Sequence, residues 1–119
     1  MAAIQPRISV ENLAKGTIIT FTNEKILDET EIVALEHSIL PIIEQAKVPA
    51  IVLNFENVKF LSSAVLGLLI RISKKVYQQD GQLKLCCINA KIFEIFKITR
   101  LDRVFEICED VDAAVRALP

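Results

Sequence analysis

The residue types that build most catalytic and metal sites are scarce in this sequence. His37 is its only histidine, and it has no acidic or cysteine partner at ligand spacing. Of the three cysteines, Cys86 and Cys87 are neighbours whose side chains would face opposite sides of a strand, Cys108 stands alone, and no Cys-x-x-Cys spacing occurs. We therefore expect no catalytic residue, no metal ion and no cofactor, and interpret the chain as a protein that is not an enzyme.

Long apolar runs and an excess of one charge are also missing. The longest apolar run, Ala64 to Ile70, is far shorter than the ~20 residues of a membrane-spanning helix. The segment from Met1 to Arg7 lacks the apolar core of a signal peptide. A net charge of −1 leaves no basic footprint for nucleic acid or a membrane surface. These absences predict a cytoplasmic protein with no membrane insertion and no nucleic-acid partner, so its partners should be proteins.

With 119 residues, of which 52% are apolar, the chain has the size of one domain with a substantial core. Alternating apolar residues predict two strands, from Ile8 to Asn12 and from Thr17 to Thr22. They should form a hairpin in which Gly16 supplies a positive φ.

An amphipathic helix is predicted next, since apolar residues recur at helical spacing up to about Ala46. Asp28 and Glu31 have the spacing of a capping box at its start. Pro41 lies far from the first turn, so it should kink the helix or end it early.

Strands and helices alternate in the rest of the chain. Strands are predicted from Ala50 to Phe55, Leu83 to Ile88 and Val104 to Ile107, and helices from Ser63 to about Gln79, after Asn89 and after Asp110. The helix after Asn89 should bury Ile92, Phe93 and Phe96. This order predicts an α/β fold with a mixed β-sheet of about four to five strands and helices packed mainly on one face.

The serine pair Ser62-Ser63 stands where the buried strand that starts at Ala50 gives way, through a polar turn, to an apolar helix. The first N–H groups of a helix have no intrahelical partner and favour negative charge, so a phosphate on either serine would be tolerated there. Serine is also a preferred N-cap, and most such pairs have no other role. From chemistry alone, the capping role is favoured.

Two motifs resemble those of the STAS domain of bacterial anti-sigma factor antagonists. The segment Phe60-Leu61-Ser62-Ser63-Ala64-Val65-Leu66-Gly67 is similar to the family's phosphorylation-site motif, and Thr99 to Phe105 is similar to its Thr-x-Leu-x-x-Val-Phe pattern. The resemblance implies that residues 1–119 form a single STAS domain with Ser63 as the phosphate acceptor and Ser62 as the fallback. Ser62 stands where the family has Asp, and Val65 where it has Gly.

The resemblance also implies a function. The unphosphorylated form would bind a serine kinase that is also an anti-sigma factor and so release a sigma factor. Phosphorylation of Ser63 would end that binding, and a serine phosphatase would restore it. The partner-binding surface would consist of Ser62, Ser63, Ala64, Val65 and Leu66.

Two other hypotheses stay open at this point. The chain could be a STAS scaffold subunit of a stress-sensing or lipid-transport complex, in which Ser63 is merely a cap; the missing acid and Val65 favour this alternative. A hydrolase is disfavoured, because Gly-x-Ser-x-Gly is absent and His37 stands alone. The sequence predicts neither the regulated sigma factor nor the oligomeric state.

Overall fold

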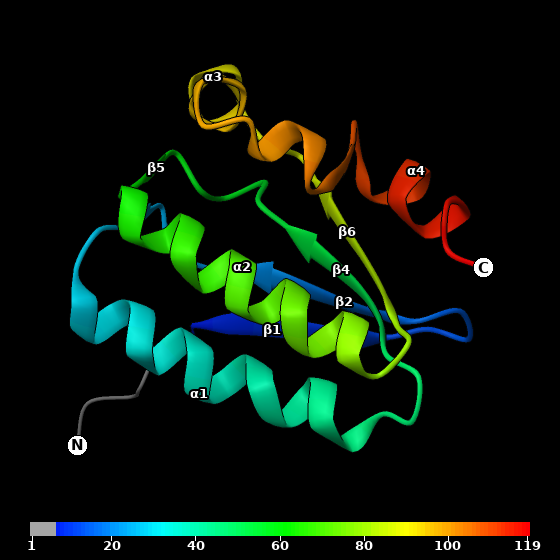
Figure 1. Cartoon of the computed structure of the whole chain (residues 1–119). Helices are drawn as coiled ribbons and strands as arrows, with labels where there is room; N and C mark the ends of the chain where they lie inside the picture. The colour runs from blue at the N-terminus through cyan, green and yellow to red at the C-terminus, as the bar shows by residue number, and fades with distance from the viewer. Residues whose placement is uncertain (1–6) are drawn as a thin grey trace.

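Five strands form one mixed β-sheet in the computed structural model, which describes residues 7–119 (Figure 1). Their bounds are β1 Ile8–Asn12, β2 Thr17–Phe21, β4 Ala50–Asn54, β6 Gln82–Cys86 and β7 Glu106–Cys108. They lie in the order β1-β2-β4-β6-β7, with β1 and β2 antiparallel and the other pairs parallel. The predicted hairpin and the predicted mixed sheet are both confirmed.

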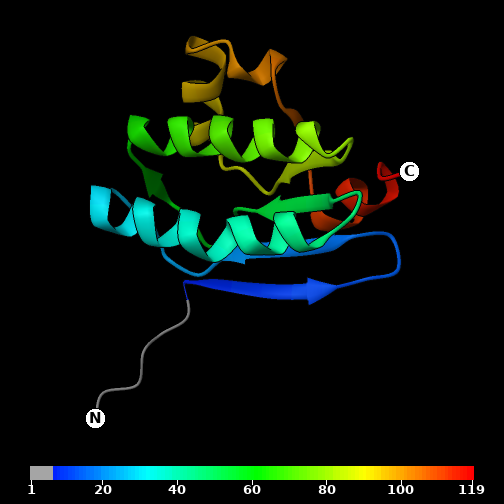
Figure 2. The same cartoon turned by 60° about the horizontal axis from the view of Figure 1, so that its bottom comes forward.

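The helices follow the parallel strands and pack mainly on one face of this sheet. They are α1 Glu29–Gln45, α2 Ser63–Gln78, α3 Ala90–Ile98 and α4 Val111–Arg116. The side chains of α1, α2 and α3 share the larger core with Ile19, Leu53 and Leu85 of the sheet. Figures 1 and 2 show α1 and α2 side by side over the sheet. Because β2, β4 and β6 are parallel and each precedes one of these helices, α1, α2 and α3 all begin at the same edge of the sheet.

The short helix α4 covers the opposite face, where Val52 and Cys86 pack against Ala114 and Leu118. Lys84 of β6 is also buried on this face, and its ammonium group pairs with the Glu106 carboxylate. A buried lysine needs such a partner, because an unpaired charge away from water is costly.

Pro41 does not end α1, contrary to one of the two expectations for it. The helix continues to Gln45, and both Ile39 and Ile43 are fully buried. Proline removes one backbone hydrogen bond, but packing on either side of it keeps the turn helical.

The glycines at the turns act through size rather than through positive φ, which corrects the prediction for Gly16. None of the glycines has a positive φ. A Cβ on Gly16 would lie 2.5 Å from the carbonyl oxygen of Ala50, and one on Gly81 would lie 2.2 Å from that of Pro49. The left-handed residue after α2 is Asp80, with φ 58°. Glycine is required because the backbones approach closely.

The C-terminal third differs from the prediction in two details. Phe93 is only half-buried, whereas Ile92 and Phe96 are in the core as expected. The last strand begins at Glu106, because residues Leu101–Arg103 form a 3-10 helix and Val104, after it, is exposed.

Within residues 7–119, no helix has the length and apolar character to cross a membrane.

Candidate functional site

The predicted site lies at the edge of the sheet where α1, α2 and α3 begin. A two-stranded parallel ribbon forms there from β3 (Lys25–Ile26) and β5 (Phe60–Leu61). The backbone N–H of Ser62 continues this ribbon by donating to the carbonyl of Ile26 at 3.0 Å. The serine pair therefore lies where the ribbon meets α2, with Ser62 as the N-cap and Ser63 as the first helical residue. Figure 1 shows how β5 leads into α2.

The two serines differ in access. Ser62 is the N-cap residue of α2, but its side chain makes no capping hydrogen bond. Its Oγ is buried and, among the described residues, has no hydrogen-bond partner. Ser63 is the first residue of the helix and is exposed, as is Ala64. A phosphoryl donor could therefore reach Ser63 directly, whereas Ser62 would first have to turn outward.

Two residues predicted to contact a partner lie in the core instead. Val65 is 0% exposed and Leu66 is 6% exposed, so neither side chain is available to a docking protein. The reason is the helical period: Ser63 and Ala64 face outward, while the next two side chains, those of Val65 and Leu66, point at the sheet. An exposed apolar side chain near the serine pair would have to come from other residues.

Phe60 is such an exposed apolar residue, and sequence reasoning did not single it out. Its side chain is 47% exposed, and the ammonium groups of Lys25 and Lys91 lie 5.8 Å and 5.9 Å from the ring centroid. These three residues come from β3, β5 and α3. The exposed place in the β5 alternation, with Leu61 buried, was the available signal, whereas the two lysines could not be placed without the tertiary fold.

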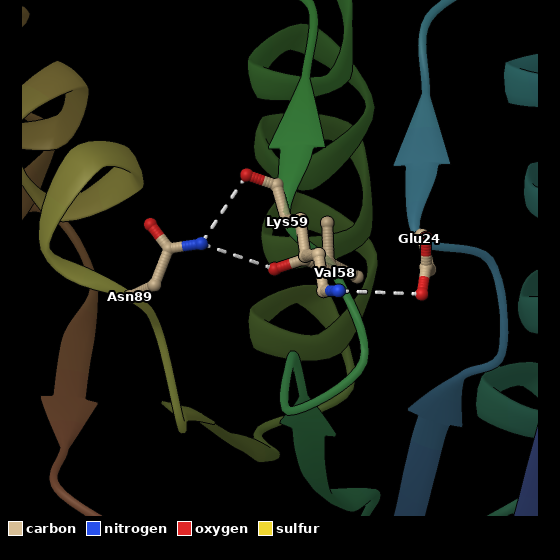
Figure 3. A network of polar contacts seen from close by, with 4 residues as sticks. All are labelled: Glu24, Val58, Lys59 and Asn89. Carbon is tan, nitrogen blue, oxygen red and sulfur yellow. Dashed lines mark hydrogen bonds and ion pairs between the residues drawn. The ribbon is translucent and has the colours of Figure 1, made fainter.

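Asn89 joins the segments that carry this surface (Figure 3). Its amide Nδ2 donates to the carbonyl oxygens of Val58 and Lys59 at 3.3 Å and 3.2 Å. Its Oδ1 accepts from the N–H of Ile92 at 2.9 Å, so Asn89 also caps α3, as predicted. The N–H of Lys59 in turn donates to the carbonyl of Glu24 at 2.8 Å. One side chain thus ties α3 to the loop before β5, and that loop is tied to the residue before β3.

The local electrostatics suit a negative group near Ser63. The first turn of α2 contains no acidic residue, so the partial positive charge of the helix N-terminus is not offset from within the helix. An exposed ion pair joins Lys59 to Glu24 at 3.5 Å.

The other chemistry-bearing side chains do not converge here. Burial raises the pKa of the Cys86 thiol, and nearby Cys87 and Cys108 raise it further, so this cysteine stays protonated. In the described part of the chain, no group of three or more His, Cys, Asp or Glu side chains could hold a metal ion. His37 is exposed on α1. What the arrangement offers is one accessible hydroxyl beside an aromatic, basic surface.

Comparison with known proteins identifies the family. The family model for the STAS domain matches residues 7–114. The chain belongs to the STAS domain family. The family implied by the sequence motifs is thus confirmed, and so is the α/β fold class that came with it.

Similar proteins include several anti-sigma factor antagonists. A putative anti-sigma factor antagonist, BtrV of Bordetella bronchiseptica, is 28% identical over 67 residues, which are 56% of this chain and 58% of that protein. The match therefore spans less than two thirds of that relative.

Solved structures share the fold over most of their length. A STAS domain protein from Planctomyces limnophilus has a TM-score of 0.81 at 24% identity, covering 92% of this chain and 96% of its own. SpoIIAA in its unphosphorylated form has a TM-score of 0.75 at 19% identity, covering 92% and 94%.

Proposed function

We propose that this chain is an anti-sigma factor antagonist that is switched off by phosphorylation of Ser63. The unphosphorylated form binds a serine kinase that is also an anti-sigma factor, and this binding releases a sigma factor. The observation that carries the proposal is the contrast within the serine pair: Ser63 is exposed at the start of α2, whereas Ser62 Oγ is buried. The likeness to antagonists, including one with a structure in the phosphorylated form, supports it.

In the phosphorylation reaction this protein supplies only the acceptor hydroxyl. The Ser63 hydroxyl oxygen attacks the γ-phosphorus of the kinase's ATP, ADP leaves, and the hydroxyl proton is lost to a base of the kinase. The antagonist contributes only an accessible hydroxyl on a rigid helix end, so it acts by binding and is a substrate rather than an enzyme. A serine phosphatase would hydrolyse the phosphoserine and restore the binding form. Both reactions belong in the cytoplasm, where sigma factors act.

The switch itself is electrostatic. A phosphate brings about −1.5 to −2 charges at pH 7. In a complex that covers Ser63 and Ala64, the phosphate would be desolvated without a positive group to pair with it. Burying an unpaired charge in this way is costly in free energy. The helix N-terminus stabilises the phosphate within the free protein, so the modified form stays folded and loses only its partner.

Phosphorylation by the anti-sigma factor kinases of the same genome tests the proposal. Each is incubated with ATP and this protein, and modified peptides are identified by mass spectrometry. Stoichiometric modification is expected in the wild type and in Ser62→Ala, and none in Ser63→Ala. Modification lost only in Ser62→Ala would show that Ser62 is the acceptor, and no modification by any of the kinases would favour the scaffold subunit.

A binding measurement tests the switch separately. Titration of the kinase and ADP into Ser63→Ala and Ser63→Asp should give tight binding for the first and weak binding for the second. One carboxylate carries less charge than a phosphate, so the loss for Ser63→Asp should be partial. Equal affinities, with circular dichroism showing both variants folded, would contradict the electrostatic switch.

A further inference from the structure

We propose that Lys25, Phe60 and Lys91, here called the Phe60 patch, form a docking surface for an acidic segment of the partner kinase. This inference rests on the proposed function and adds to it the chemistry of the contact. The patch lies outside the motif that suggested the acceptor serine, apart from Phe60 itself.

The patch is built in advance of binding. Lys25 and Phe60 are paired residues of the parallel β3–β5 ribbon, and the N–H of Phe60 donates to the carbonyl of Glu24 at 3.1 Å. Lys91 lies near the start of α3, two residues after Asn89, whose amide holds the loop before β5. Hydrogen bonds fix all three segments before a partner binds. Binding at the Phe60 ring should therefore cost little conformational entropy of this protein.

The two ammonium groups of the patch are not used in ion pairs among the described residues. Three other lysines form ion pairs, namely Lys75, Lys84 and Lys59, the last with Glu24 next to the patch. Among the described residues, Lys25 and Lys91 lie over the Phe60 ring and form no ion pair. Carboxylates of a partner could therefore bind these ammonium groups without breaking an internal pair. In a chain of net charge −1, two free cations around one half-exposed ring favour an acidic partner.

The composition of the patch favours a protein over a nucleic acid. Both ammonium groups already lie within 6 Å of the ring centroid, so a base stacking on the ring would compete with them. Carboxylates can approach the ammonium groups where they stand, while an apolar side chain contacts the exposed part of the ring. Aromatic residues of this kind are frequent anchors of protein interfaces.

The patch is also continuous with the proposed acceptor. Phe60 and Ser63 are three residues apart along β5 and the start of α2, a separation of at most about 10 Å. A kinase that places its ATP at Ser63 would therefore cover Phe60 as well. This geometry supplies the apolar contact that the buried Val65 and Leu66 cannot supply.

Calorimetry with the kinase that modifies Ser63, in the presence of ADP, tests the patch at two salt concentrations. The variants are Phe60→Ala and the double charge reversal Lys25→Glu/Lys91→Glu. The matched control is Lys97→Glu, because Lys97 lies on the same helix as Lys91, 5.8 Å from the ring centroid of Phe93, outside the patch. Thermal unfolding followed by circular dichroism verifies that each variant is folded.

Phe60→Ala should weaken binding about tenfold or more, as expected for an aromatic anchor. The charge reversal should weaken it by a similar factor and reduce its dependence on salt, while Lys97→Glu should stay within about twofold of wild type. If the wild type binds the kinase and both patch variants bind it with the same affinity, the proposed docking surface is wrong, while the proposed function stands. Failure of the wild type to bind any kinase would overturn both.

A fluorescein-labelled single-stranded RNA tests the competing class of partner. The expected result is no binding at physiological salt. Binding that is lost in Phe60→Ala, together with unchanged kinase affinity, would overturn the assignment to an acidic protein.

Discussion

Ser62 and Ser63 are adjacent in the sequence, yet their hydroxyls lie in different environments. At the scale of single residues, this difference decides which serine is available for modification. Ser62 Oγ is buried without capping α2, whereas Asp28, Asn89 and Asp110 each accept a hydrogen bond from the first turn of their helix. A serine at an N-cap position is thus not always a cap, even where its backbone conformation suits that role.

Ser62→Ala is therefore predicted to leave the free energy of unfolding within about 0.5 kcal/mol of wild type, because no capping bond is lost. The matched control is Asp28→Ala. Its Oδ1 accepts from the Glu31 N–H at 2.8 Å, so that change should cost about 1 kcal/mol. Urea unfolding followed by circular dichroism measures both. Equal losses would show that the Ser62 hydroxyl caps α2 in solution.

At the scale of elements, the site depends on how the starts of β3, β5 and α3 are joined. Asn89 uses both ends of its amide, one to cap α3 and one to hold the carbonyls of Val58 and Lys59. The arrangement of the Phe60 patch therefore depends on a residue whose sequence signal indicated only a helix cap.

Asn89→Ser separates the two roles. Serine retains an oxygen for the Ile92 N–H but has no amide to donate to the loop, so unfolding should become easier by about 1 kcal/mol. Asn89→Ala loses the cap as well and should cost about 1 kcal/mol more. Urea titrations of the three proteins provide the comparison. A serine variant as stable as wild type would show that the bonds to Val58 and Lys59 add no net stability.

Helices α1 and α2 are joined by an ion pair with a pH signature. Arg71 donates Nε to Glu36 Oε2 at 2.9 Å and Nη2 to Oε1 at 3.0 Å. This hydrogen bonding, more than the charge of Arg71, holds the pKa of the Glu36 carboxyl below its ordinary value. Since the folded pKa is the lower one, the stabilisation is present above the unfolded pKa and is lost as the pH falls through the folded pKa.

Glu36→Gln should accordingly destabilise the protein at neutral pH, and its difference from wild type should close as the pH falls below about 4. Thermal unfolding at a series of pH values measures this difference. In an Arg71→Gln background the same substitution should show no such closure. A difference that is constant with pH in the wild-type background would mean that the pair is not formed in solution.

At the scale of the whole molecule, the central strands β4 and β6 are covered on both faces, so they are reached only when the structure opens. Cys86 lies on β6, with β4 and β7 on either side, and its side chain is fully buried under α4. Burial also raises the pKa of the Cys86 thiol, so the reactive thiolate is disfavoured even where reagent arrives.

We expect Cys86 to be alkylated only through global unfolding. In a Cys87→Ser/Cys108→Ser variant, its rate of reaction with iodoacetamide should rise with urea as steeply as the unfolding equilibrium measured by circular dichroism. Circular dichroism without urea confirms that the background is folded. Fast alkylation with little urea dependence would show instead that the sheet opens locally at β6.

The sequence by itself determined most of the elements, their order and the family, but not the short strands β3 and β5 or the 3-10 helix at Leu101–Arg103. Apolar periodicity and the caps Asp28, Asn89 and Asp110 are local signals, so they predicted most helices and strands within a few residues. The motif from Phe60 to Gly67 likewise identified the family and placed the candidate acceptor at the start of a helix.

Only the tertiary structure decided which side chains at that helix start are accessible. Val65 and Leu66 proved to be core residues, Ser62 Oγ proved buried, and Phe60 emerged between lysines from two other elements. These outcomes depend on parallel pairing of β3 with β5 and on the crossover that brings α3 beside them. Contacts between residues so distant in the chain are selected by burial of the shared core, which no local pattern contains.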